Sequence, residues 1–200
     1  MTQIAQVERR KRTFSSLWKR VFEVGVLDLF LGVCLRRSFA RAGVLKVTPG
    51  WPFPKIMNTG GYIEASDCRF FPGVRIECWK GAVVSIGKGT YLNRGTEIVA
   101  AKAVYIGAYC KIARDVIIMD NDQHPVDQTG IEMKPVLIED RVWLGSRAMV
   151  LKGVCIGHDS IVGAGAIVTK SVPPYSVVVG PAARIIKTLS QTDESQQKEE

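Results

Sequence analysis

Proton transfer near neutral pH is the chemistry best matched by two side chains of this sequence, His124 and His158. An imidazole has an ordinary pKa of about 6.5, so it exchanges protons under physiological conditions. His124 precedes Pro125 in a polar segment that also contains Asp120 and Asp122. Either carboxylate, or a backbone carbonyl of the same segment, is a candidate to orient the ring and fix its tautomer. His158 lies in the segment Ile-Gly-His-Asp-Ser, which predicts an exposed corner residue.

The histidines and cysteines do not predict a metal site. A zinc site of the carbonic anhydrase type needs three histidines, and two histidines in separate segments do not supply it. The five cysteines are scattered and form no C-x-x-C pair, a pattern typical of free thiols in a reducing compartment. We therefore expect no metal and a cytoplasmic location.

Length and composition favour one soluble domain with an appendage. The chain has 200 residues, 46% of them hydrophobic and 23% charged, which excludes wholesale disorder. The net charge is +8, with many of the basic residues near the N-terminus. Such a charge favours an acidic partner, but the sequence has no zinc-finger spacing and no aromatic-rich RNA-binding motif. Nucleic acid is therefore not expected as a partner.

A six-residue period decides the fold. One bulky aliphatic residue recurs every sixth position in three in-phase runs, and a small residue or Val follows most of them four places later. The aliphatic positions are Ile86, Leu92, Ile98, then Ile106, Ile112, Ile118, then Ile138, Leu144, Val150, Ile156, Val162 and Val168.

A helix, with its period of 3.6, does not place residues six apart on one face, and a strand, with its period of 2, does not explain why only one residue in six is bulky. A chain that turns a corner every six residues accounts for the pattern, because three short strands then form one triangular coil of 18 residues. The aliphatic residues point inward, and we expect the Gly that often follows them to ease the turn. Coils stacked about 4.8 Å apart bury a continuous core. The sequence therefore predicts an all-β, parallel β-helix.

Other segments flank the repeats. Residues 14–42 have helical spacing, and their apolar run is shorter than the ~20 residues that span a bilayer. Such a helix either docks on protein, which we favour, or makes peripheral contact with the inner face of a membrane through residues 9–41. We expect a helical extension at 1–47, a linker at 48–61, the repeat domain at 62–187 and a disordered acidic tail at 188–200. The segment 119–137 interrupts the repeats, and a loop of this length in a compact domain is usually functional.

Three stretches, 138–146, 162–170 and 179–186, resemble the hexapeptide-repeat acyltransferases, whose fold is a left-handed parallel β-helix. They are most similar to the sugar O-acetyltransferase branch, which includes galactoside, maltose and colanic-acid-type acetyltransferases. The resemblance implies transfer of an acetyl group from acetyl-CoA to a saccharide hydroxyl, without a covalent enzyme intermediate. It also implies a homotrimer with active sites between subunits.

The same resemblance assigns roles to particular residues. It places the catalytic base in the interrupting loop, at the His124-Pro125 pair, and puts Asn93 in contact with the reacting groups. It implies a coenzyme channel of mostly small residues with nearby cations for the CoA phosphates, formed by Trp143, Gly145, Ser146, Ala164, Thr169, Lys170, Arg184 and Lys187. Two alternatives stay open: a non-catalytic β-helix that serves as an assembly scaffold, and an acyltransferase with a non-sugar acceptor.

Overall fold

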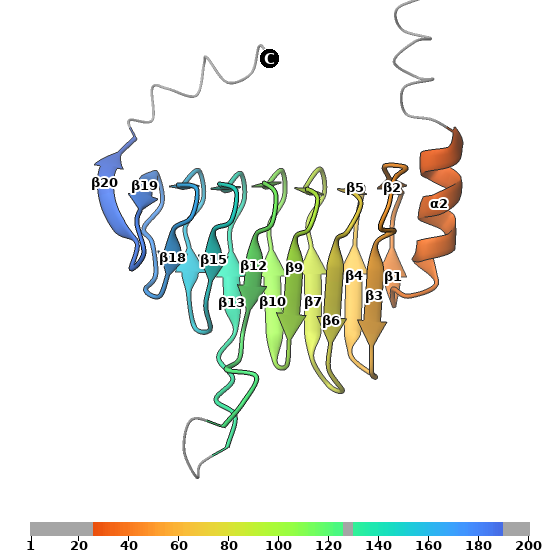
Figure 1. The fold of residues 1–200 in the computed structure, drawn as a ribbon, viewed down its shortest axis with the longest axis horizontal. Helices are drawn as coiled ribbons and strands as arrows, with labels where there is room; N and C mark the ends of the chain where they lie inside the picture. The colour runs from red at the N-terminus through yellow and green to blue at the C-terminus, as the bar shows by residue number, and fades with distance from the viewer. Residues whose placement is uncertain (1–25, 126–129, 190–200) are drawn as a thin grey trace, which may run out of the picture.

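The protein is a triangular prism of stacked β-strands, seen in a computed structural model that describes residues 26–125 and 130–189 (Figure 1). Strands from successive turns of the chain pair in parallel and build three flat sheets, which we name A, B and C. The chain visits the sheets in the order A, B, C and completes about six turns. The predicted left-handed parallel β-helix is therefore confirmed.

Each sheet takes one strand from each turn. Sheet A contains β1 (Arg41–Ala42), β4 (Tyr62–Ala65), β7 (Val83–Ile86), β10 (Ala103–Ile106), β13 (Val136–Ile138) and β16 (Cys155–Ile156). Sheet B contains β2 (Leu45–Val47), β5 (Cys68–Phe70), β8 (Tyr91–Leu92), β11 (Lys111–Ile112), β14 (Trp143–Leu144), β17 (Ile161–Val162), β19 (Ser176–Val179) and β20 (Arg184–Thr188). Sheet C contains β3 (Lys55–Asn58), β6 (Arg75–Cys78), β9 (Glu97–Ala100), β12 (Ile117–Met119), β15 (Met149–Val150) and β18 (Ile167–Val168).

The core lies along the axis of the prism and consists of the predicted aliphatic ladder. All twelve aliphatic positions are buried, with exposed fractions of 3% or less. Equivalent residues of successive turns stack in register, as Ile112 does on Leu144 and Leu144 on Val162. The small or Val residues four places later are buried as well, including Thr96, Cys110 and Ala148.

The corners differ from the sequence interpretation in one respect. The left-handed backbone conformation occurs three residues after the aliphatic position, as at Arg147 and Gly165, and not at the glycine that directly follows it. That glycine is needed for a different reason. A Cβ on Gly145 would lie 2.6 Å from the backbone nitrogen of Ala164 in the next turn. The glycine therefore lets two turns approach closely and does not supply an unusual φ.

The β-helix begins earlier than the repeat pattern predicts. Strands β1, β2 and β3 form the first turn, so the segment 48–61 is not a linker: Lys55–Asn58 pair with β6 in sheet C. This first turn escaped the pattern because it lacks the Ile-Gly spacing of later turns, although its Leu45 and Val47 are buried in the same core.

Helix α2 (Val26–Arg36) covers the N-terminal end of the prism (Figure 1). It ends before the predicted residue 42, because Arg41–Ala42 are already strand β1, and the predicted part from 14 to 25 lies outside the described residues. Leu35 is buried against the first turn, whereas Leu27, Phe30 and Val33 remain exposed. One side of the helix is therefore docked on the coil. None of the helices within 26–125 and 130–189 is both long and apolar enough to cross a membrane.

At the other end, β20 folds back antiparallel on β19 and closes sheet B. The part of the predicted acidic tail beyond residue 189 lies outside the described residues.

Removing an inward aliphatic side chain tests the stacked core. We expect Ile112→Ala to lower the free energy of unfolding by about 2–5 kcal/mol, because it leaves a cavity between two stacked turns. Ile186→Ala is the matched control, since that side chain is 63% exposed on β20. Equal denaturant midpoints for the two variants would contradict the assignment of the inner ladder.

Candidate active site

The loop that carries His124 leaves the prism at the edge between sheets C and A, after β12, and the chain returns to sheet A at β13. Figure 1 shows it projecting away from the body of the prism. The two legs of the loop are joined at its base by an antiparallel bridge between Asn121 and Met133. A backbone hydrogen bond from Lys134 N–H to the Asp120 carbonyl oxygen, 2.8 Å long, adds to this join.

Asp120 anchors the first leg of the loop and faces the prism rather than His124. Its carboxylate is fully buried and accepts hydrogen bonds of 2.6–2.8 Å from the backbone N–H groups of Ala101, Lys102 and Ala103. Those residues form the wider corner of the preceding turn, where the repeat slips by two residues. The Asn121 side-chain amide donates a further hydrogen bond of 2.9 Å to the same carboxylate. The carboxylate therefore closes this corner, and none of its described hydrogen bonds is with the imidazole of His124.

His124 itself is exposed. Its backbone N–H donates a 2.7 Å hydrogen bond to the carbonyl oxygen of Asp122. No side chain within residues 26–125 and 130–189 hydrogen-bonds to its ring. The described part of a single chain therefore provides no group that orients the imidazole. An exposed imidazole at the tip of an anchored leg is accessible to a substrate.

Lys152 holds the two legs of the loop together from the neighbouring corner. Its ammonium contacts the Asp122 carboxylate and lies 2.6 Å from Glu132 Oε2, while Lys134 Nζ lies 2.5 Å from Glu132 Oε1. Hydrogen bonds from Lys134 and Lys152 lower the pKa of Glu132 from 4.5 to about 2. The carboxylates of Asp122 and Glu132 in turn raise the pKa of Lys152. Asp122, like Asp120, is thus engaged away from the ring.

Sequence reasoning did not identify Lys152 as part of the site. Its position in the repeat is an ordinary corner, and its partners come from both legs of an irregular loop. The only sequence signal was the presence of charged residues on both sides of His124, namely Asp122 before it and Glu132 and Lys134 after it.

Asn93 and part of the predicted coenzyme channel lie on a different edge, between sheets B and C. Asn93 follows β8, and Gly145 and Ser146 follow β14 on the same edge. Ala164 follows β17, and Arg184 lies beside Val179 where β19 ends. Gly145 is buried under the next turn, whereas Ala164 and Arg184 are exposed. The structure therefore aligns these predicted residues along one edge of the prism.

The remaining predicted coenzyme residues are divided between two places. Trp143 and Lys187 point outward from sheet B, and Trp143 is 48% exposed. Thr169 and Lys170 follow β18, which places them on the C–A edge, the edge of the His124 loop. A single chain thus puts Asn93 and His124 on separate edges, with sheet C between them.

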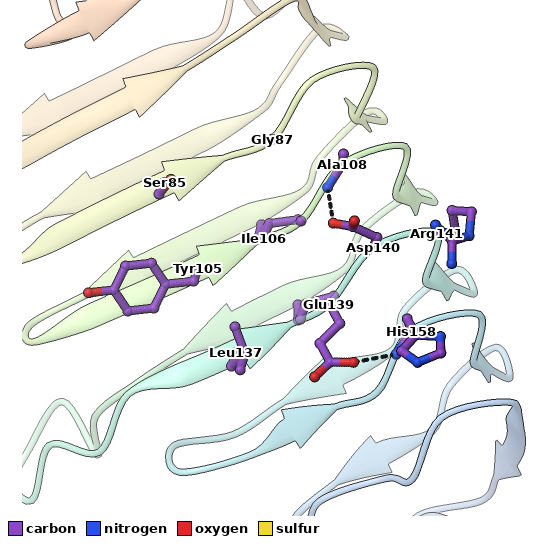
Figure 2. Close-up of a pocket in the computed structure, with 12 residues that line it drawn as sticks. Ser85, Gly87, Tyr105, Ile106, Ala108, Leu137, Glu139, Asp140, Arg141 and His158 are labelled. Carbon is purple, nitrogen blue, oxygen red and sulfur yellow. Dashed lines mark hydrogen bonds between the residues drawn. The ribbon is translucent and has the colours of Figure 1, made fainter.

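A pocket of about 640 Å³ lies elsewhere, on sheet A and its edge with sheet B (Figure 2). Figure 2 shows how its carboxylates are used: Asp140 accepts a hydrogen bond from the Ala108 backbone N–H, and Glu139 accepts one from the His158 backbone N–H, each 2.8 Å long. The His158 ring contacts Asp159, whose pKa is lowered chiefly by its hydrogen bond with Arg141.

These groups join one corner of the β-helix to the next. His158 therefore has a corner position, as the sequence indicated, and this pocket contains none of the predicted site residues. Across the part of the chain that the structure describes, no three His, Cys, Asp or Glu side chains are grouped as a metal site would need.

The ion pairs of Lys152 predict how the loop responds to substitution and pH. The contribution of Glu132 is complete above its ordinary pKa of 4.5 and is lost as the pH falls toward about 2. The contribution of Lys152 is complete below its ordinary pKa of 10.5 and is lost only at higher pH. We expect Lys152→Met to speed amide hydrogen exchange at residues 120–124 and 130–134 at pH 7. Lys111→Met, on sheet B, is the control. Unchanged exchange in Lys152→Met would show that the loop does not depend on these contacts.

Comparison with known proteins gives a coherent result. A family model described as "Hexapeptide repeat of succinyl-transferase" matches residues 135–170. The chain is 30% identical over 184 residues to the Escherichia coli K12 protein WbbJ, which carries the name of a lipopolysaccharide biosynthesis O-acetyl transferase. That match covers 86% of this chain and 92% of WbbJ. It is 36% identical over 118 residues to the Escherichia coli K12 galactoside O-acetyltransferase, covering 56% of this chain and 58% of that protein.

A solved structure has the same fold. It is a galactoside acetyltransferase in complex with coenzyme A, which superposes with a TM-score of 0.59 at 23% identity and covers 92% of this chain and 88% of that one. The fold, the repeat match and the near full-length similarity to WbbJ agree, and the chain belongs to the family of hexapeptide-repeat acetyltransferases.

Proposed function

We propose that the protein transfers an acetyl group from acetyl-CoA to a hydroxyl group of a saccharide. The observation that carries this proposal is the loop at the C–A edge, which presents an exposed His124 from legs held by Asp120 and Lys152. A scaffold protein would have no need to anchor an exposed imidazole in this way. The similarity to two proteins named as O-acetyltransferases supports the reaction class.

In the proposed reaction, the neutral His124 ring accepts the proton of the acceptor hydroxyl as that oxygen attacks the thioester carbonyl. The carbonyl oxygen becomes an oxyanion in the tetrahedral intermediate, and the Asn93 side-chain amide donates a hydrogen bond to it. The intermediate collapses by breaking the carbon–sulfur bond, and the imidazolium returns its proton to the leaving CoA thiolate. Attack is direct, with no acyl-enzyme.

Small residues support the proposed position of acetyl-CoA. Gly145, Ser146 and Ala164 lie in succession on the B–C edge, where a pantetheine arm can approach the backbone. Arg184 lies at the end of this edge, and Lys187 and the Trp143 ring lie on the adjoining face of sheet B. In the proposal these three residues bind the nucleotide of the coenzyme and its phosphates. Thr169 and Lys170 on the C–A edge would contact coenzyme bound to a neighbouring subunit.

The separation of Asn93 and His124 supports the proposed homotrimer. Within one chain they lie on different edges, so a site that uses both residues takes one from each of two chains. A closed ring of three subunits joined by such head-to-tail contacts contains three equivalent sites. The proposal therefore links assembly to activity, with the partner of the His124 ring coming from the next subunit.

Replacing the proposed base tests the mechanism. We expect His124→Ala to reduce acetyl-CoA-dependent thiol release by about 10²–10⁴-fold, because the variant lacks the imidazole that accepts the hydroxyl proton in the proposed reaction. His158→Ala is the control and retains activity, since that ring serves a corner of the β-helix. Wild-type turnover by an assembled His124→Ala protein would contradict the proposal that His124 is the general base.

Mixing two inactive variants tests whether the site is shared. His124→Ala and Asn93→Ala chains are unfolded together and refolded at equal concentrations. If each site combines one residue from each of two chains, about a quarter of the sites in a random mixture receive both intact residues, and activity returns to that extent. No recovery, with trimers confirmed by light scattering, would place both residues in one chain's site.

A further inference from the structure

The outward face of sheet B has a row of cations and aromatic rings. Lys46 pairs in register with Arg69, Arg69 with Tyr91, and Tyr91 with Lys111, which pairs with Trp143. Because parallel strands are about 4.8 Å apart, these five side chains form a continuous line along the prism.

The N-terminal end of this row is hollowed into a pocket of about 460 Å³. Its side-chain lining combines two cations, two aromatic rings, one carboxylate and one amide, from Lys46, Arg69, Phe71, Tyr91, Asp67 and Asn93. The Phe71 and Tyr91 rings meet edge to face with centroids 6.3 Å apart, which leaves an aromatic wall beside the two cations.

The row of charges on sheet C includes a carboxylate, unlike the two adjoining cations of the pocket. Arg75 lies in register between Lys55 and Glu97 and forms an ion pair with Glu97 at 3.4 Å. On sheet A, Glu64 is in register with Ser85, whose hydroxyl donates a 2.7 Å hydrogen bond to it.

Lys46 and Arg69 are in register with each other, and neither forms an ion pair or a side-chain hydrogen bond with any residue in the described ranges. Like charges at adjacent register positions destabilise a sheet. Both side chains are only half-exposed, which limits their hydration. An anion between them removes this repulsion, and the nearby Asp67 carboxylate is suited to accept hydrogen bonds from hydroxyl groups.

We propose that this pocket binds the acceptor, and that the acceptor is an anionic saccharide whose carboxylate or phosphate group lies between Lys46 and Arg69. The sugar ring packs on Tyr91 and Phe71. This inference rests on the proposed function, because it assigns the acceptor side of the same reaction.

The position of Asn93 links the pocket to the chemistry. Asn93 lines the pocket where β8 meets the B–C edge, and the proposed coenzyme residues Gly145, Ser146 and Ala164 follow on later turns of that edge. Acceptor and acetyl-CoA would therefore approach Asn93 from opposite directions along the prism. The reacting hydroxyl lies at the end of the sugar nearest Asn93, with the anionic group at the far end.

Substitution of the two cations tests the acceptor pocket with the full-length protein. The probes are a panel of glycans that share one ring and carry a carboxylate, a phosphate or no charge, for example D-glucuronate, D-glucose 1-phosphate and D-glucose, together with oligosaccharides of each type. Binding is measured by saturation-transfer NMR without acetyl-CoA, and acetylation by mass spectrometry. The variants are Lys46→Gln and Arg69→Gln. Lys55→Gln is the control, because Lys55 is an exposed lysine at the same end of the prism on sheet C.

We expect charged glycans to bind more tightly than neutral ones. In each pocket variant the KM for the acceptor should rise about tenfold, because one charge-assisted hydrogen bond to the anionic group is lost. The KM for acetyl-CoA should stay unchanged. Preference between carboxylate and phosphate glycans identifies the natural anionic group. Lys55→Gln should match the wild type in all assays.

Two outcomes separate this inference from the proposed function. Acetylation of neutral glycans alone, with wild-type KM values in both pocket variants, overturns the acceptor pocket and leaves the O-acetyltransferase assignment intact. Binding of charged glycans that weakens in the pocket variants, with no acetylation of any glycan, supports the pocket and contradicts the proposed reaction. Absence of charged-glycan binding in the wild type also overturns the pocket.

Discussion

The in-register stacking of short parallel strands is the constraint on which the rest of this structure depends. Each turn pairs its three strands with the turns on either side, so a residue lies directly above its equivalent in the preceding turn. The inner positions must then be aliphatic along the whole prism, and positions such as Gly145 must lack a side chain because the next backbone lies against them. Such a scaffold gives little freedom to its faces and concentrates variation at its corners.

The candidate active site uses one of these corners. The prism positions the base of the loop, and buried hydrogen bonds hold the first residues of the loop against the prism. Asp120 is the critical residue, because its carboxylate satisfies three backbone amides that the slip in the repeat would otherwise leave without partners. Lys152 then joins the two legs through Asp122 and Glu132. An exposed histidine thereby acquires a defined place without being buried.

The same stacking places residues that are one turn apart in the sequence next to each other on one face of the prism. Residues one turn apart lie side by side, so a cation or ring repeated on successive turns becomes a row on one face. On sheet C the row contains Lys55, Arg75 and Glu97, and its carboxylate forms an ion pair with Arg75. On sheet B the cations Lys46 and Arg69 adjoin, and neither forms an ion pair with a described residue. The outward face of sheet B therefore has two adjoining positive charges that the folding of the prism does not require.

The sequence by itself determined the repeat, the inner ladder and the interrupting loop, because a strict six-residue period leaves only one regular way to bury its aliphatic residues. It could not determine the first turn, whose Leu45 and Val47 lack the glycine spacing of later turns, nor the end of the N-terminal helix. Only the tertiary structure decided that Asp120 serves the coil, that Lys152 holds the loop, and that Asn93 and His124 lie on different edges. Those facts depend on which turn lies beside which, and pairing between turns is a property of the folded coil that no local pattern contains.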